Sequence, residues 1–232
     1  MTGPISFRRE DAGQPALLYP PYRSTLLRTP REASVRIPQT VTETTGPTQW
    51  TRLMGAAMAD LTTQHAAPPI GQRIIVAGRV LDDRRRPVPR TVMEIWQANA
   101  AGRYIHKKDQ WDAPLDPNFT GAGRVITDDE GRFRFVTIRP GAYPWGNHPN
   151  AWRPAHIHLS LLGPAFATRL TTQLYFPDDP LIALDPIAGA VPAPFVDRLV
   201  ARFDLDLTEP SWALGYRFDV VLRGHDATPM EA

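Results

Sequence analysis

Cysteine is absent from this sequence of 232 residues. Without a thiol the chain cannot form disulfides, bind a metal through thiolates or use a cysteine nucleophile. Lysine is scarce as well, since Lys107 and Lys108 are the only two. Arginine supplies the remaining cationic side chains, and its planar guanidinium favours bidentate pairing with carboxylates.

The sequence also lacks a charge excess and a long apolar run. Its 26 basic and 24 acidic residues leave a formal net charge of +2, too small to indicate a nucleic-acid or membrane-surface partner. No apolar run approaches the ~20 residues that span a bilayer. The first residues do not show the basic-then-apolar pattern of a secretory signal. We therefore expect a soluble cytoplasmic protein.

Residues 1–46 are rich in proline, arginine, serine and threonine and show neither helical nor strand periodicity. Their apolar stretch at 16–22 contains prolines, which exclude it from a central strand. We expect this segment to be an extended arm that lies on another surface. Residues 48–61 place apolar side chains at helical spacing and predict a short amphipathic helix.

Short strand patterns separated by turn residues dominate the rest of the sequence. The expected strands are 73–81, 88–97, 123–127, 131–138, 155–162, 168–176 and 214–222, with a second helix at 194–203. Many short strands and few helices predict an all-β fold, a β-sandwich with long loops. We expect a single domain over residues 1–232, in which the arm (1–46) precedes a β-sandwich core (47–232).

His156 and His158 are the first candidates for metal binding. Alternate side chains of a strand leave the same face, so both imidazoles can reach one metal ion. The sequence nearby leaves the metal open. No glutamate follows as a cupin-like site requires, and no acidic residue recommends itself for a ferrous two-histidine-one-carboxylate site. Zinc would need a third histidine, either His106 or His148, and both histidines of the pair could instead be structural.

Two tyrosines stand in unusual positions. Tyr143 lies in a proline-rich turn and Tyr104 ends a strand-to-loop passage. A phenol has a pKa of ~10 in water and ionises near neutrality only beside a strong positive charge. A trivalent metal provides that charge, and two anionic oxygens favour Fe(III) over Fe(II). The alternative is that each tyrosine is an ordinary core or rim residue.

Long runs of the sequence resemble the intradiol ring-cleaving dioxygenases. They lie within residues 17–225 and include PVPRTVMEIWQANAAGRYIHKKD, GRVITDDEGRFRF, PGAYPWGNHPNAWRPAHIHLSLLGP and TTQLYFPDDPLI. The extended arm is similar to that of the β chains that act on protocatechuate. The resemblance implies a prealbumin-like β-sandwich and Fe(III)-dependent cleavage of protocatechuate by O2 to 3-carboxy-cis,cis-muconate. The alternative within the family is a chain that acts alone on catechol or hydroxyquinol.

The resemblance also implies roles for individual residues. One Fe(III) per chain would be held by Tyr104, Tyr143, His156 and His158. Tyr143 would leave the metal when the substrate binds, and Arg153 would stabilise negative charge on the reacting substrate. The residues expected to contact the substrate are Tyr22, Trp96, Pro144, Gln173 and Ile187.

A partner chain follows from the same resemblance. A homologous α subunit would complete the pocket within a larger αβ oligomer. Asp185 lies near the expected pocket wall, where an inward carboxylate would oppose an anionic substrate. Two alternatives lie outside the family, a metal-free binding module and a zinc hydrolase.

Overall fold

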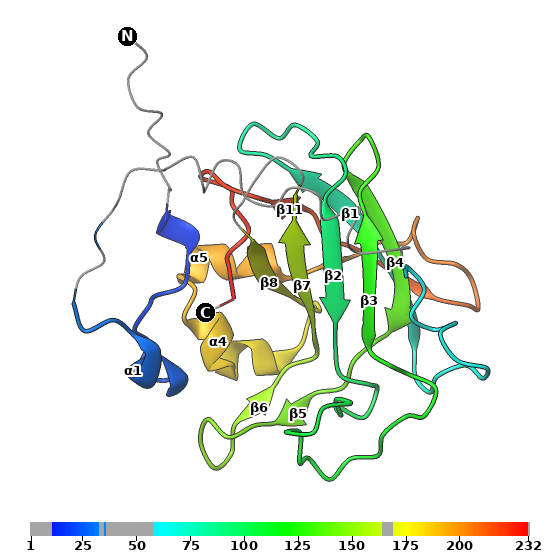
Figure 1. Cartoon of the computed structure of the whole chain (residues 1–232), viewed down its shortest axis with the longest axis horizontal. Coiled ribbons are helices and arrows are strands. Elements are labelled where there is room, and N and C mark those ends of the chain that lie inside the picture. The colour runs from blue at the N-terminus through cyan, green and yellow to red at the C-terminus, as the bar shows by residue number, and fades with distance from the viewer. Residues whose placement is uncertain (1–10, 33–34, 36–57, 164–168, 232) are drawn as a thin grey trace.

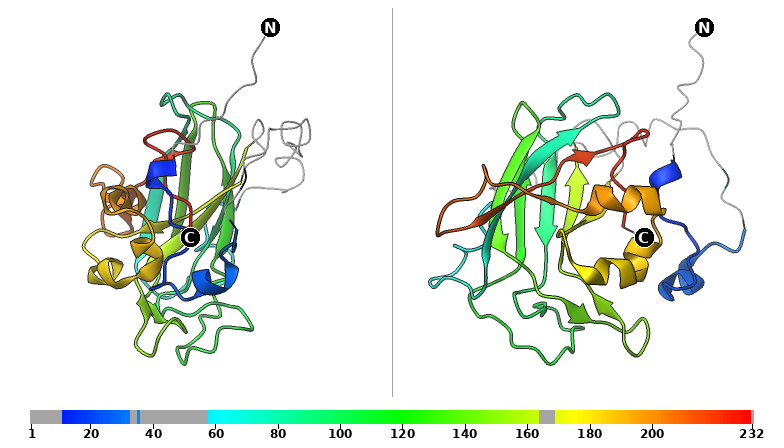
Figure 2. Two further views of the ribbon diagram at one scale, coloured as in Figure 1. Left: turned by 90° about the vertical axis from the view of Figure 1, so that its left-hand side faces the viewer. Right: turned by 180° about the vertical axis from the view of Figure 1, so that it is seen from behind.

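The computed structural model describes residues 11–32, 35, 58–163 and 169–231, which contain two stacked β-sheets (Figure 1, Figure 2). One sheet contains β1 (Arg73–Leu81), β4 (Arg132–Ile138), β9 (Arg202–Phe203), β10 (Leu214–Arg217) and β11 (Val220–Val221). The other contains β3 (Ala122–Ile126), β2 (Val92–Trp96), β7 (His156–Leu162) and β8 (Leu170–Tyr175), in that order. A separate ribbon pairs β5 (Tyr143–Pro144) with β6 (Trp152–Arg153). The predicted all-β sandwich is confirmed.

The pairing of β7 with its neighbours determines which side chains meet. β7 runs antiparallel to both β2 and β8. Trp96 of β2 is paired with His158, and His158 is in turn paired with Gln173 of β8. His156 is paired with Tyr175. Cross-strand partners share a face, so these five side chains lie together at one end of the sheet.

The core fills the space between the two sheets. β7 contributes Ile157, Leu159 and Leu161, each 0% exposed, to the same buried cluster as Ile74 of β1 and Phe135 of β4. Burying each such side chain contributes roughly 1.5–3 kcal/mol. Because successive residues of a strand point to opposite faces, this burial commits His156 and His158 to the face away from the sandwich core.

The helices in the described part of the chain are short and lie on the periphery of the sandwich. They are η1 (Asp11–Gly13), α1 (Ser24–Arg28), η2 (Pro180–Leu184), α4 (Pro186–Gly189), α5 (Ala193–Val196) and η3 (Asp197–Leu199). Figure 1 shows α4 and α5 beside β8, and α1 at the outer side of them. None of the described helices is long and apolar enough to cross a membrane.

Most of the predicted strands are present with shifted ends. The strand expected at 88–97 begins only at Val92, after a turn in which Arg90 has a φ of 52°. The strand expected at 214–222 is divided into β10 and β11. At this break the side chain of Asp219 accepts the hydrogen bond from the Arg79 backbone N–H at 2.9 Å, in place of a backbone carbonyl.

The helix predicted at 194–203 is present only up to Leu199, as α5 followed by the 3-10 helix η3, and the prediction is wrong for residues 200–203. The α-helix ends at Val196, and Val200 is extended with φ −97° and ψ 121°. Arg202 and Phe203 then pair with β10, so sheet formation overrides the local apolar pattern.

The two N-terminal predictions are only partly tested. Residues 48–57 of the other predicted helix lie outside the described residues, and its end is not helical, because Met58 forms a bridge with Arg124 and Asp60 one with Val136. The extended arm contains the short helix α1, which corrects that prediction for Ser24–Arg28. The described arm does contact another surface, since the Ala16 N–H donates to the Ala190 carbonyl at 3.0 Å.

Candidate active site

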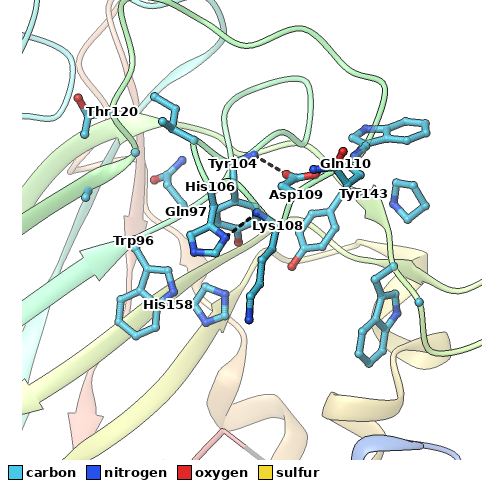
Figure 3. A pocket seen from close by; sticks show the side chains of 17 residues that line it. Trp96, Gln97, Tyr104, His106, Lys108, Asp109, Gln110, Thr120, Tyr143 and His158 are labelled. Carbon is cyan, nitrogen blue, oxygen red and sulfur yellow. Dashed lines mark hydrogen bonds between the residues drawn. The ribbon is translucent and has the colours of Figure 1, made fainter.

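The four predicted metal ligands lie together at one end of the β7 sheet. The rings of Tyr104 and Tyr143 meet edge to face with 5.4 Å between centroids. The ring centroids of Tyr143 and His156 are 5.5 Å apart, and those of His156 and His158 are 4.8 Å apart. Figure 3 shows Tyr104, Tyr143 and His158 around one pocket. Residues from three separate segments of the chain therefore converge on a small volume.

Both histidines use Nδ1 for an outer hydrogen bond. His156 Nδ1 lies 2.7 Å from the Pro154 carbonyl oxygen, and His158 Nδ1 lies 3.1 Å from Oε2 of Glu231. A carbonyl and a carboxylate can only accept, so each Nδ1 carries the proton and donates. In a neutral ring the Nε2 atom then has a free lone pair, the form that binds a metal.

The turn before Tyr104 is held by local hydrogen bonds. The Asn99 side chain accepts from the backbone N–H groups of Ala101 and Arg103 at 2.9 and 3.0 Å. Gly102 has a φ of +79°, and a Cβ at this position would lie 2.3 Å from the Ala142 carbonyl oxygen. The Tyr104 N–H donates to Asp109 at 2.8 Å. The close approach of Gly102 to Ala142 brings the two tyrosines together.

In the metal-free protein the surroundings of Tyr104, Tyr143 and His156 favour the neutral form of each side chain. Burial raises the pKa of Tyr104 well above its ordinary value, with a further increase from Tyr143. Burial also raises the pKa of Tyr143, against an opposing effect of the Arg153 charge. Burial, followed by the Arg153 charge, lowers the pKa of His156 well below its usual value. The site thus presents a neutral His156 imidazole and two neutral phenols, and the phenols ionise only when a strong cation binds.

The residues present fit a ferric ion. The Tyr104 hydroxyl is buried and has no hydrogen-bond partner among the described residues. The Tyr143 hydroxyl lies 3.3 Å from His156 Nε2 and can only donate to its lone pair, so this proton lies between two candidate ligand atoms. Two phenol oxygens and two imidazole nitrogens suit a hard trivalent ion.

The zinc site that was the alternative to iron is not formed among the described residues. The described residues contain no group of three or more His, Asp or Glu side chains that could hold a metal. His106 lines the pocket, but His148 is exposed in a turn. Neither supplies a third ligand beside His156 and His158, so the zinc hydrolase loses its structural basis.

Arg153 lies beside the candidate ligands, opposite Tyr143 in the β5–β6 ribbon. Its side chain is 4% exposed. Its Nη2 donates to the side chains of Gln173, Tyr175 (3.2 Å) and Asp185 (3.0 Å). Burial lowers the pKa of Arg153, but the neighbouring Tyr175 and Asp185 raise it by a larger amount. The pKa therefore lies above its ordinary value, and the guanidinium stays charged. Its Nε has no partner among the described residues and remains available as a donor.

Asp185 points into this cluster and not toward the cavity. Its Oδ2 accepts from Arg153 and from the Tyr175 hydroxyl at 2.9 Å, and its Oδ1 accepts from the Ile187 N–H at 3.1 Å. The carboxylate is therefore used to neutralise Arg153 and to cap α4. It does not present an unpaired charge to a substrate.

A cavity of about 810 Å³ opens onto the ligands (Figure 3). Of the predicted substrate contacts, Trp96 and Pro144 line it together with Tyr104, Tyr143 and His158. Trp96 stacks on His158 at 4.8 Å with 3° between the planes. This wall is apolar and aromatic, which suits a flat ring.

The other predicted residues do not line this cavity. Gln173 accepts a hydrogen bond from Arg153. The Ile187 N–H donates to Asp185, which in turn accepts from Arg153. Tyr22 lies further out, 5.5 Å from the ring of Trp145, which does line the cavity. Its role in substrate binding is therefore not visible in the described chain.

Sequence reasoning missed Tyr175 and Glu231. Tyr175 could have been found, because it stands two residues after Gln173 on a strand and so shares its face. Glu231 could not, since 73 residues separate it from His158 and no local pattern connects them.

The fold and the site together define a class, a β-sandwich in which two tyrosines and two histidines converge beside one cavity. Comparison with known proteins agrees. The family profile described as "Dioxygenase" matches residues 44–224. The profile described as "Protocatechuate 3,4-dioxygenase beta subunit N terminal" matches residues 7–40. The chain therefore belongs to the family of intradiol ring-cleaving dioxygenases.

Individual relatives refine this assignment. The chain is 55% identical over 225 residues to the protocatechuate 3,4-dioxygenase beta chain of Burkholderia cepacia, covering 96% of each. It is 31% identical over 161 residues to the alpha chain from the same organism, covering 68% of this chain and 76% of that one. The structure of hydroxyquinol 1,2-dioxygenase from Pseudomonas putida DLL-E4 matches with a TM-score of 0.55 and 25% identity, over 75% of this chain and 60% of that one.

Proposed function

We propose that this chain is the iron-bearing β subunit of an enzyme that cleaves protocatechuate with O2 to 3-carboxy-cis,cis-muconate. The convergence of Tyr104, Tyr143, His156 and His158 beside one cavity carries the proposal. The similarity to a protocatechuate 3,4-dioxygenase beta chain over 96% of the sequence supports the substrate. The likeness to an alpha chain supports a homologous partner, with which this chain would form an αβ oligomer.

One Fe(III) would be held by the two phenol oxygens and the two Nε2 atoms. When bound, the ion would supply the positive charge that ionises both tyrosines and the catechol, and would make the ring reactive toward O2. The protein holds the imidazoles ready for this role, because Pro154 and Glu231 occupy both Nδ1 atoms.

Tyr143 would act as the proton acceptor when the substrate binds. Its phenolate would take one of the two substrate protons and become a neutral hydroxyl, and a solvent-derived hydroxide would take the other. Burial favours that neutral form, since it raises the pKa of Tyr143. The neutral hydroxyl would then remain near Arg153, which the β5–β6 ribbon places opposite it, because the metal would hold the Nε2 lone pair of His156.

Arg153 would stabilise the negative charge that develops on the substrate ring. Its charge is fixed by Asp185, its Nη2 is already bonded, and its unpartnered Nε can donate to the substrate. A preorganised cation in a water-poor site needs no rearrangement as charge develops. Gln173 would hold the guanidinium in place.

The substrate carboxylate would lie toward the mouth of the cavity. Tyr22 would lie near that carboxylate, since its ring lies 5.5 Å from that of Trp145, which lines the cavity, and the Arg28 guanidinium lies 4.9 Å from the Tyr22 ring centroid. Trp96 and Pro144 would provide the apolar surfaces that hold the ring. Activity of the chain alone on catechol or hydroxyquinol is the competing outcome.

The test is a visible spectrum of the iron-loaded protein, followed by anaerobic addition of protocatechuate. Phenolate-to-iron charge transfer should colour the protein, the band should move to longer wavelength with substrate, and oxygen should then bleach it. Tyr104→Phe should weaken the band. Tyr216→Phe is the matched control, because Tyr216 is 4% exposed but belongs to the sandwich core.

Two results would contradict the proposal. A protein that stays colourless after iron is supplied would remove the tyrosines as ligands and favour a binding module. Equal turnover of catechol or hydroxyquinol by the chain without any partner would favour the alternative within the family. Arg153→Ala should lower turnover but keep the iron, and loss of iron would overturn the role of Arg153.

A further inference from the structure

Glu231 is distant in sequence from every candidate ligand, yet its carboxylate reaches the outer nitrogen of one of them. Oε2 of Glu231 lies 3.1 Å from Nδ1 of His158. The side chain of Glu231 is 24% exposed and that of His158 10%. The contact is therefore largely shielded from solvent, where a charged hydrogen bond is stronger than at the surface.

The segment that carries Glu231 is tied to the site by hydrogen bonds of its own. The Glu231 N–H donates to the Thr171 carbonyl at 2.8 Å. The Thr172 hydroxyl, which is 0% exposed, donates to the Pro229 carbonyl at 2.7 Å. The Met230 N–H donates to the Gln14 side chain at 2.9 Å. Both β8 and the N-terminal arm thus hold the segment, and the carboxylate does not depend on its own contact for its position.

The two histidines differ in their outer partners. His156 donates to a neutral backbone carbonyl, whereas His158 faces a carboxylate. Trp96 covers one face of the His158 ring, with 4.8 Å between ring centroids, while Nδ1 faces Glu231 and the Tyr104 ring centroid lies 6.5 Å from that of His158. A carboxylate behind an imidazole fixes the tautomer and makes the ligating nitrogen more basic.

We infer that Glu231 is a positioning residue for the metal, which holds His158 in the Nδ1–H tautomer and strengthens its Nε2 as a ligand. This inference rests on the proposed function, since it assigns a role toward the proposed iron. Outer partners of this kind typically change metal affinity by about 10–100-fold when they are removed. Glu231 would act only through His158 and would not touch the substrate.

The test compares Glu231→Ala and Glu231→Gln with the unaltered protein, isolated with any chain that co-purifies. Iron retention is followed in competition with a chelator. E231A should release its iron at a chelator concentration at least about 10-fold lower than the unaltered protein requires. E231Q keeps a hydrogen-bond acceptor but has no charge, so its iron affinity should decrease less than that of E231A. Glu209→Gln is the matched control, because Glu209 pairs with Arg134 at the surface and is 52% exposed.

A second readout does not involve iron. Long-range proton–nitrogen correlation spectra of the metal-free protein report which nitrogen of His158 carries the proton. The unaltered protein should show the Nδ1–H tautomer alone, and E231A should show a mixture. If the unaltered protein binds no iron, the proposed function fails, but this spectrum still decides whether Glu231 sets the tautomer.

Two outcomes would overturn the inference. In one, E231A has an iron affinity within about twofold of the unaltered protein and an unchanged His158 tautomer. Such a change would be smaller than the affinity loss expected when an outer partner is removed. The other is E231A whose metal-free form unfolds at a much lower temperature, since the residue would then be structural. The anchoring hydrogen bonds of the segment use backbone atoms and Thr172, so we expect the metal-free melting temperature to stay near that of E209Q.

Discussion

Removal of the Asp185 carboxylate should destabilise the protein far more than removal of a surface carboxylate. The Asp185 side chain is 0% exposed and the Arg153 side chain 4% exposed, with 3.0 Å between the charged atoms. In Asp185→Ala the guanidinium stays buried without its counter-charge. Breaking such a pair from one side costs roughly 3–5 kcal/mol. The variant also loses the cap on the Ile187 N–H, worth about 1 kcal/mol at a longer helix.

The measurement is urea unfolding of the metal-free chain followed by tryptophan fluorescence, supported by thermal melting. For a domain of this size, about 2–4 °C per kcal/mol converts the cost into a decrease of roughly 6–20 °C in melting temperature. Asp226→Ala is the matched control. Asp226 pairs with Arg85 at 2.6 Å, but the side chains are 45% and 59% exposed. Such a surface pair is worth about 0–1 kcal/mol.

A double variant sharpens this prediction. Arg153→Met combined with Asp185→Ala removes both charges, so it should be more stable than Asp185→Ala alone, although it carries one more substitution. The reasoning would be refuted by an Asp185→Ala variant no less stable than Asp226→Ala. It would also be refuted by a double variant whose losses simply add.

Three further predictions concern the site without its metal. Tyr104→Phe should leave the stability of the metal-free chain unchanged or raise it by about 1 kcal/mol, because it removes a buried hydroxyl that has no partner among the described residues. Tyr143→Phe should instead cost about 1 kcal/mol, and chemical denaturation of both variants compares them. Gly102→Ala should cost about 1–3 kcal/mol and impair iron uptake, whereas Gly146→Ala should be nearly neutral, since its Cβ would meet nothing within 4 Å. Burial lowers the pKa of His156, so the unfolded chain binds the proton more readily, and stability should fall as the pH decreases below about 6.5 toward the lower folded pKa. His156→Gln should flatten this part of a pH-stability curve, and an unchanged curve would contradict the assignment.

The sequence alone determined the fold class and most of the candidate ligands. The strand at Arg73–Leu81 was predicted to the residue, because its β-branched run has no competing helical period. Alternation in β7 was enough to place His156 and His158 on one face. The tyrosines were assigned through family resemblance, since no local rule brings Tyr104 and Tyr143 to the same strand end.

Tertiary structure decided what depends on contacts between distant segments. Arg202 and Phe203 form a strand and not a helix because β10 offers them partners. The direction of Asp185 was undetermined until Arg153 and Tyr175 were seen beside it. Glu231 reaches His158 only because β8 and the arm hold its segment there. Local periodicity reports which face a side chain leaves, whereas the partner it meets is set by packing between segments, which no short window of sequence contains.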